Sequence, residues 1–205
     1  MMRLPSWSLA FIAVCTPLAF TASAQVIAPV SAPAVSSDLR YTIDEGASSV
    51  AAKVSFFGLA SKTARFPKMA GDVKIVPGKP EAARIDVTFD ATALEAPDSV
   101  TLSRLRGEKF FWVEKYPAVR FVGEKLTLTS AKKGKVEGQL TARGVTNPAT
   151  LAIEFDANPL KAADGQPIRF TGKTTIDRRE FGMKSYQLIV GNKVKITLSA
   201  TMDPA

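Results

Sequence analysis

The chain has 205 residues, of which 27 are Lys or Arg and 19 are Asp or Glu, so its formal net charge is +8. It contains no histidine and a single cysteine. Ser-His-Asp and Cys-His catalysis, histidine-ligated zinc or iron, and c-type haem attachment are therefore excluded. The basic residues are spread singly rather than clustered with aromatic residues, which argues against nucleic-acid binding and leaves weak attraction to an anionic membrane surface open.

The first 24 residues have the order of a secretory signal peptide. Arg3 precedes an apolar stretch from Trp7 to Phe20, and Ala22-Ser23-Ala24 has the pattern of a cleavage site. The apolar stretch is shorter than the roughly 20 residues that cross a bilayer. We therefore expect export to the periplasm and removal of residues 1–24, which also removes Cys15 and leaves no disulfide.

Residues 25–38 contain Pro, Ala, Ser and Val without periodicity, and we expect them to form a flexible linker. Residues 39–205 are then the folded domain. A chain of that length buries roughly two thirds of its unfolded surface and can be stabilised by its core alone.

Apolar residues then recur at every second position, which is the periodicity of half-buried β-strands. The first set is Val50, Ala52, Val54 and Phe56. Seven further sets follow at 69–76, 84–90, 119–128, 136–142, 151–155, 168–176 and 194–202. Short connections that contain turn residues, such as Pro77-Gly78, predict antiparallel neighbours. The pattern predicts an all-β domain of eight antiparallel strands, packed as a sandwich or closed into a barrel.

Three glycines, Gly71, Gly138 and Gly172, fall on the apolar faces of different strands. A glycine at such a position either removes volume from the interior or lets the strand bend at a barrel corner. Both effects favour a barrel over a filled sandwich.

The segment 98–111, between the third and fourth predicted strands, is the one helical candidate. Asp98 can cap its first turn, and Leu102 and Leu105 share a face. A helix here would lie across an end or a side of the barrel, with Phe110-Phe111 as its apolar anchor.

Carboxylates are the remaining candidates for catalysis. Asp44 with Glu45, or Asp177 with Glu180, could act as an acid and base pair on a sugar if a cleft held them at a suitable separation. Arg178 and Arg179 are adjacent, so a solvated strand end with local ion pairs is favoured over a carboxylate-pair hydrolase.

The apolar strand faces leave other uses open. A closed barrel of this size can hold a small ligand, or it can be filled and act through protein contacts. An outer-membrane barrel would instead turn its apolar residues outward. Mid-strand phenylalanines and a charged polar face favour the soluble barrel without excluding the membrane one.

Four ordered stretches carry a resemblance to a known family. They are YTID at 41–44, FFWVEKYPAVRF at 110–121, VEGQLTARGVTNPATL at 136–151, and the IDRREFGM and VGNKVKITL segments within 176–198. Together they resemble the bacterial YceI-like family of lipocalin-like, polyisoprenoid-binding envelope proteins.

The resemblance implies an extended, antiparallel, eight-stranded lipocalin-like barrel with a helical insertion between the third and fourth strands. It also implies non-catalytic binding, storage or transport of an isoprenoid lipid, such as an isoprenoid quinone. No cofactor or metal is expected, and a homodimer is expected. The ligand-binding residues that it implies are Phe56, Phe89, Phe121, Leu140, Phe155 and Phe170 on the wall, with Phe110, Phe111, Phe181 and Met183 near the ends.

The sequence departs from the family pattern around the insertion. The stretch from Thr101 to Leu105 lacks the usual acidic and histidine groups, Trp112 stands where many members have Asp, and Arg143 replaces a common histidine. These departures remove polar groups that could recognise a ligand head group, and Trp112 would add apolar surface instead.

Overall fold

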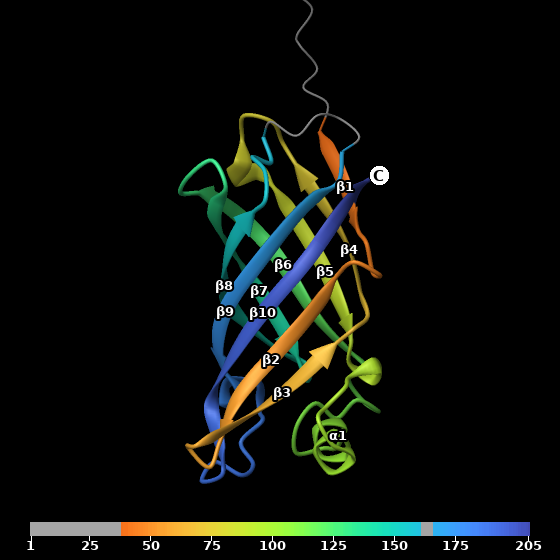
Figure 1. The fold of residues 1–205 in the computed structure, drawn as a ribbon, viewed down its shortest axis with the longest axis vertical. Coiled ribbons are helices and arrows are strands. Elements are labelled where there is room, and N and C mark those ends of the chain that lie inside the picture. The colour runs from red at the N-terminus through yellow and green to blue at the C-terminus, as the bar shows by residue number, and fades with distance from the viewer. Residues whose placement is uncertain (1–37, 161–165) are drawn as a thin grey trace, which may run out of the picture. The chain divides into compact units, whose positions relative to one another are not determined.

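The computed structural model describes residues 38–160 and 166–205, which form an antiparallel barrel (Figure 1). The expected signal peptide and all of the expected linker except Asp38 lie outside these residues. The strands are β1 (Leu39–Ile43), β2 (Ser49–Phe56), β3 (Ala60–Phe66), β4 (Met69–Ile75), β5 (Arg84–Asp90), β6 (Ala118–Leu128), β7 (Lys133–Ala142), β8 (Val145–Phe155), β9 (Ile168–Asp177) and β10 (Val190–Pro204).

Four helical segments join these strands. The α-helix α1 (Ser99–Arg106) and the 3₁₀ turns η1 (Pro80–Ala82), η2 (Ala91–Ala93) and η3 (Arg178–Phe181) lie in the connections. Within the described part of the chain, no helix is long and apolar enough to cross a membrane.

Strand β10 closes the barrel. It pairs with β9 on one side, and on the other side with β1 near its end and with β2 over the rest of its length. β1 and β2 are thus successive parts of one barrel strand, interrupted at 44–48, and β3 and β4 form a second such pair around Pro67. The predicted eight-stranded antiparallel barrel is confirmed.

Two strand segments, β1 and β3, were not predicted from the sequence. β1 has only five residues, and it was not counted as a strand although Leu39, Tyr41 and Ile43 alternate inward. In β3 the inward positions are Lys62, Ala64 and Phe66, and the lysine breaks the apolar alternation.

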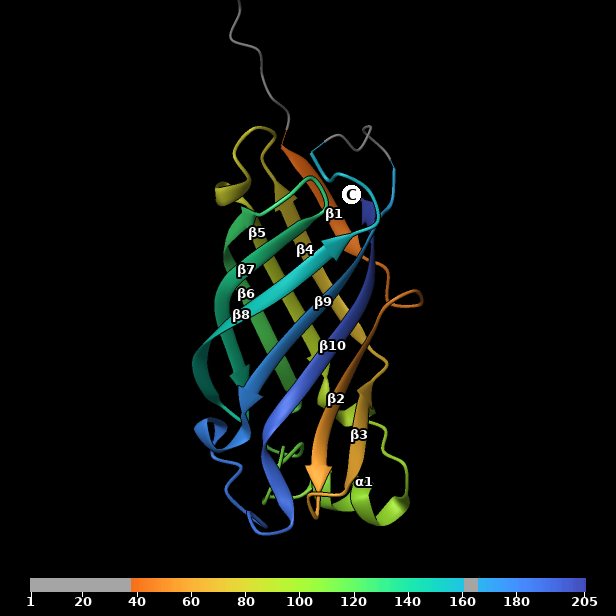
Figure 2. The same ribbon diagram turned by 60° about the vertical axis from the view of Figure 1, so that its left-hand side comes forward.

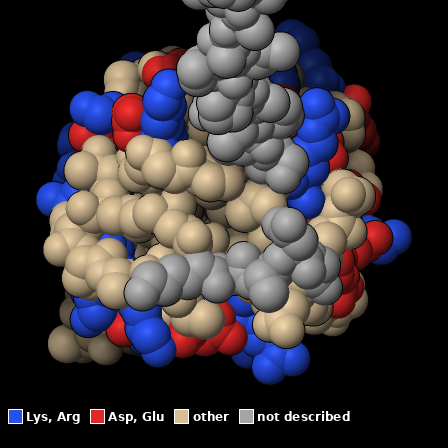
Figure 3. Space-filling model, turned by 90° about the horizontal axis from the view of Figure 1, so that it is seen from above, with Lys and Arg blue, Asp and Glu red and all other residues tan. Residues whose placement is uncertain are grey.

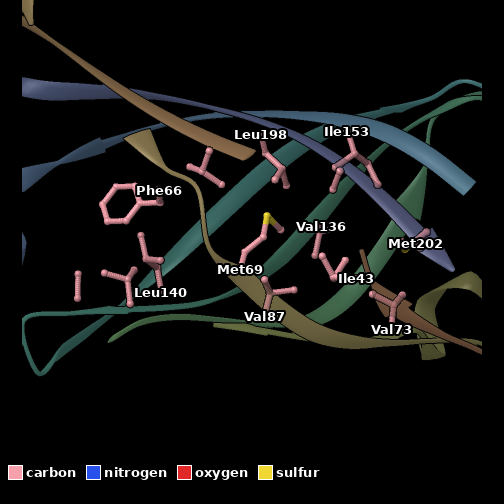
Figure 4. Close-up of a cluster of buried hydrophobic side chains, with 14 of the residues drawn as sticks. Ile43, Phe66, Met69, Val73, Val87, Val136, Leu140, Ile153, Leu198 and Met202 are labelled. Atoms are coloured by element: carbon pink, nitrogen blue, oxygen red, sulfur yellow. The ribbon is translucent and has the colours of Figure 1, made fainter. Parts of the chain in front are cut away.

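The apolar residues of each strand face the interior of the barrel. Along β10, Leu198 and Met202 are buried among residues of the other strands, whereas Lys195 is exposed on the outside. Figure 4 shows the same arrangement from several strands, with side chains such as Met69 and Val136 directed into the barrel. An outer-membrane barrel would need the reverse, with apolar side chains outside.

Two of the three glycines that were predicted to make room or to allow bends, Gly71 and Gly138, allow bends. A Cβ atom on Gly71 would collide with the carbonyl oxygen of Asp86, and one on Gly138 with that of Val122. Neighbouring backbones therefore approach most closely where the side chain is missing, so these glycines let strands bend and leave no volume to a ligand.

Helix α1 begins as predicted and ends earlier. The side chain of Asp98 accepts a hydrogen bond from the Thr101 amide at 2.7 Å, which caps the first turn. The helix stops at Arg106, and the rest of the predicted segment forms turns that bury Phe110. Here α1 lies beside β3 at one end of the barrel (Figure 2).

The segment before α1 covers the outer edge of β3. The backbones of Arg65 and Glu95 exchange hydrogen bonds of 3.0 and 2.9 Å. The sheet is therefore continued by a loop where β3 has no strand neighbour, which protects an edge that would otherwise be open.

The two ends of the barrel differ. The end that carries the start of β1 and the C-terminus has its charged side chains mostly toward the margin, around uncharged residues (Figure 3). The other end is built by α1, the β2–β3 turn and the segment from Gly182 to Ile189.

Candidate functional site

A cavity of about 610 Å³ lies inside the barrel. Side chains from all ten strands contribute to its wall, and most of them are aliphatic or aromatic. Such a volume is typical of small-molecule sites, which are mostly apolar with a few polar groups. The barrel is therefore not filled by its own side chains, which argues against the filled-barrel alternative.

The cavity is long and narrow. Its wall includes residues of β10 from Val190 to Met202, a distance of about 40 Å along the strand at the usual rise per residue. A strand tilt of about 40° reduces this to about 30 Å along the barrel axis. Spread over that length, a volume of 610 Å³ makes the cavity much longer than it is wide.

One end of the cavity is closed and apolar. The rings of Phe155 and Phe170 lie 5.9 Å apart there, and Ile75 and Met202 are each 2% exposed. A ligand at this end would meet only hydrocarbon and thioether surface.

The polar lining residues gather mainly at the opposite end, which we call the mouth. They include Lys62 on β3, Asp98 and Arg104 at α1, and Tyr186 before β10. Lys62 Nζ donates to Asp98 Oδ2 at 2.6 Å, and this bond together with those from Thr101 lowers the pKa of Asp98 to about 2. The carboxylate thus holds both β3 and the first turn of α1 beside the opening.

Arg178 is the most deeply buried cation in the described residues, at 2% exposure. Its guanidinium donates to the carbonyl oxygens of Gly191 at 2.9 Å, Ser185 at 2.8 Å and Val190 at 2.8 Å, and also to Met183 O and Asn192 Oδ1. These bonds use all five donors of an arginine. Burial lowers the pKa of Arg178, which also lines the cavity, and its hydrogen bonds shape the segment before β10.

Most of the ligand-binding residues implied by the family resemblance line this one cavity. They are Phe56, Phe89, Phe110, Phe111, Phe121, Leu140, Phe155, Phe170 and Met183. Phe181 is the exception, because it lies in η3, is 1% exposed and is not part of the cavity wall. It lies where β9 ends, at the mouth end of the barrel, but the 3₁₀ turn packs its ring into the core outside the cavity wall.

The residues that line the mouth were not predicted from the sequence. Lys62, Val100, Arg104 and Tyr186 all line the cavity, and none was a candidate. Lys62 breaks the apolar alternation of β3, so the strand pattern does not point to it. The others lie on a helix and a loop, where no strand periodicity points inward.

Two of the carboxylates proposed for catalysis, Asp177 and Asp44, have structural partners. Asp177 is bound to Arg179 at 2.7 Å and lies 3.6 Å from Lys193 Nζ, and the hydrogen bond from Arg179 holds its pKa well below the usual range. Asp44 accepts from the amide of Gly46 at 2.8 Å. The segment 177–180 is a charged strand end and turn, as the sequence favoured, but Asp177 and Arg178 are buried in it rather than solvated.

The two candidate pairs, Asp44 with Glu45 and Asp177 with Glu180, also lie far from each other, so their members cannot combine into one site. Asp177 pairs opposite Lys193, whereas the Asp44 amide donates to Thr201 O, eight residues further along β10 and thus about 26 Å away. Sugar hydrolysis needs carboxyl groups within about 10 Å of each other. Among the described residues, no cluster of His, Cys, Asp or Glu could hold a metal ion.

Two positions that depart from the family pattern lie outside the cavity wall. Arg143 donates to Gly182 O at 3.1 Å and to Glu108 O at 2.8 Å, and its guanidinium lies over the Trp112 ring. Neither Arg143 nor Trp112 lines the cavity. The expectation that Trp112 adds apolar ligand surface was therefore wrong, because its ring packs on Tyr116.

Known proteins match this chain in sequence and in fold. A model of the YceI-like domain matches residues 41–202. A UPF0312 protein of Shewanella oneidensis is 29% identical over 164 residues, which are 79% of this chain and 86% of the relative. A UPF0312 protein of Shewanella baltica is 30% identical over 168 residues, with the same coverage of both chains.

Two solved structures share the barrel. Burkholderia cenocepacia BcnA superposes with a TM-score of 0.68 at 23% identity and covers 78% of this chain and 98% of its own. A polyisoprenoid binding domain from Saccharophagus degradans, implicated in plant cell wall breakdown, gives 0.62 at 14% identity and covers 82% and 99%. Identities this low show the fold alone, but the family model spans most of the sequence. The chain belongs to the YceI-like family.

Proposed function

We propose that this chain binds the apolar tail of a polyisoprenoid lipid inside its barrel, without catalysis. The main observation in support of tail binding is the long, narrow cavity. It is closed by Phe155 and Phe170 at one end and bounded by polar groups at the other. A linear hydrocarbon tail fits such a channel, while a polar head group would remain at the mouth.

The energetics favour a long ligand. Each buried methylene contributes on the order of 0.8 kcal/mol, so a five-carbon isoprene unit contributes roughly 4 kcal/mol. Association itself costs about 4–15 kcal/mol, which a single unit barely offsets. Affinity is therefore expected to rise steeply with tail length until the channel is full.

The solved neighbour from Saccharophagus degradans supports the same ligand class, since it is described as a polyisoprenoid binding domain on the same fold. We further propose that the protein acts in the periplasm, where it stores or carries a lipid such as an isoprenoid quinone. The signal-peptide pattern of residues 1–24 supports this location.

Displacement of an apolar fluorescent probe tests the proposal. Isoprenoid alcohols of increasing length are titrated into the probe-loaded protein, and displacement should strengthen with length. Ala149 faces the cavity, so Ala149→Trp is expected to weaken binding at least tenfold. Ala152 is exposed on the outer face of the same strand, so Ala152→Trp is the matched control and should bind normally. Equal affinity for both variants would contradict binding inside the barrel.

A further inference from the structure

The large exposed apolar side chains of the described residues all lie at the mouth. They are Phe57 at 62% exposure, Leu59 at 98%, Val100 at 59%, Tyr186 at 37% and Leu188 at 99%, and we call them the mouth rim. They come from the β2–β3 turn, from α1 and from the segment before β10. Exposed apolar side chains gathered in one place mark an interaction surface.

Two parts of the rim are joined to each other. The Phe57 amide donates to Ile189 O at 2.7 Å, which ties the β2–β3 turn to the turn before β10. Leu59 and Leu188 therefore project from neighbouring turns. Phe57 and Tyr186 also line the cavity, so the rim is continuous with the apolar interior.

The backbone at these turns is unusual. Phe57 has a φ of 53° and Tyr186 has a φ of 55°, in the left-handed region that bulky residues rarely adopt. The amides of Ile189 and Val190 donate to Tyr186 O at 3.0 and 2.8 Å and hold the second turn in place. Strained aromatic residues at both turns indicate that their position serves a function rather than core packing.

The charges around the rim are mostly positive. Residues 57–62, 98–110 and 182–190 contain five basic residues and two acidic ones, so their net charge is 5 − 2 = +3. Arg104 and Lys109 place their cationic groups 5.7 and 5.3 Å from the centre of the Tyr186 ring. Exposed leucines and an aromatic ring among cations are the composition of surfaces that bind the interface of an anionic bilayer.

We propose that the mouth rim docks on an anionic bilayer, with Leu59 and Leu188 inserted among the acyl chains and the nearby cations at the head groups. The cavity would then open against the membrane, and an apolar tail could enter it without crossing water. The use of the surface for ligand exchange rests on the proposed lipid-binding function, whereas the docking itself does not.

Vesicle binding tests the docking separately from ligand binding. The full chain is expressed, and the purified protein is sedimented with vesicles of phosphatidylcholine alone or mixed with phosphatidylglycerol, both free of isoprenoids. The variants are Leu59→Asp, Leu188→Asp and the uncharged Leu59→Ala. Ala131→Asp is the matched control, because it adds the same charge on an exposed turn at the opposite end.

We expect stronger binding to the phosphatidylglycerol vesicles and a loss of about tenfold in partitioning for each aspartate variant at the rim. Leu59→Ala should lose less, and Ala131→Asp should bind like the unaltered chain. All of these proteins should keep their affinity for the apolar probe in solution, so a failure of docking is distinguishable from a failure of lipid binding. Equal vesicle binding by all variants, or a change in oligomeric state as the only effect, would overturn the docking proposal.

Discussion

Lys62 Nζ donates to Asp98 Oδ2 at 2.6 Å and so joins strand β3 to the first turn of α1 beside the mouth. Both residues line the cavity, and both are partly exposed. The bond bridges the barrel wall and the helical insertion at the place where a ligand would enter. It therefore links the local folding of the insertion to access to the interior.

Lys62→Met is expected to speed the dissociation of a bound apolar probe several-fold, because α1 loses its tie to β3. The helix cap survives, since Asp98 Oδ1 still accepts from the Thr101 amide. Stability to urea should change little, because exposed ion pairs contribute little. Arg120→Met is the control, since it removes the ion pair with Asp86 between β6 and β5 on the outer barrel face. Stopped-flow measurements that gave the same rate for both variants would contradict this role.

Arg178→Met is expected to destabilise the protein by about 3 kcal/mol or more. The substitution leaves several buried carbonyl oxygens between Met183 and Gly191 without a donor, and such groups are costly when unsatisfied. Urea unfolding measures the total loss, and hydrogen exchange should show that protection falls first in residues 183–192. Lys173→Met, at an exposed position on β9, is the control and should cost much less. Similar losses from both variants would show that Arg178 does not organise this segment.

Phe170→Ala is expected to let the cavity accept a longer tail. The ring lies 5.9 Å from Phe155 at the closed end, so its removal lengthens the channel. The stability loss should fall below the roughly 3–5 kcal/mol of a fully packed phenylalanine, because the ring already borders a cavity. Phe56→Ala makes the same change near the mouth and should leave the preferred length unaltered. Titration with isoprenoid alcohols of graded length distinguishes the two variants.

Acid is expected to weaken the fold below about pH 4. The folded-state pKa values of Asp98, about 2, and of Asp177 lie below the ordinary value of 3.8. Both carboxylates therefore stabilise the folded state fully above pH 4, and this contribution is lost as the pH falls toward 2. Thermal unfolding followed by circular dichroism should show a falling Tm over this range. Asp177→Asn should lower the Tm at pH 7 and flatten the fall, and an unchanged pH profile would contradict the assignment.

The sequence predicted the barrel and most of its inner wall because strand alternation is a local property. Inward phenylalanines such as Phe121 and Phe155 follow from period two, and the family resemblance identified them as ligand-facing. The mouth could not be predicted in this way, since Lys62, Arg104 and Tyr186 meet only after three distant segments have folded.

Local composition also led to a wrong prediction of burial at η3. Charged residues are usually exposed, so Arg178 and Arg179 were interpreted alike as parts of a solvated turn. In the structure Arg178 is buried because backbone carbonyl oxygens surround it, while Arg179 stays at the surface and binds Asp177. Sequence alone does not distinguish two adjacent arginines, since their surroundings come from the segment before β10.

Mass spectrometry of an organic extract shows whether the cavity holds an isoprenoid tail. The protein and its Ala149→Trp and Ala152→Trp variants are purified from the native host without detergent and extracted. We expect a polyisoprenoid near one per chain in the unaltered protein and in Ala152→Trp, and a strong depletion in Ala149→Trp. Extracts without any isoprenoid, or with equal amounts from all three proteins, would contradict this expectation.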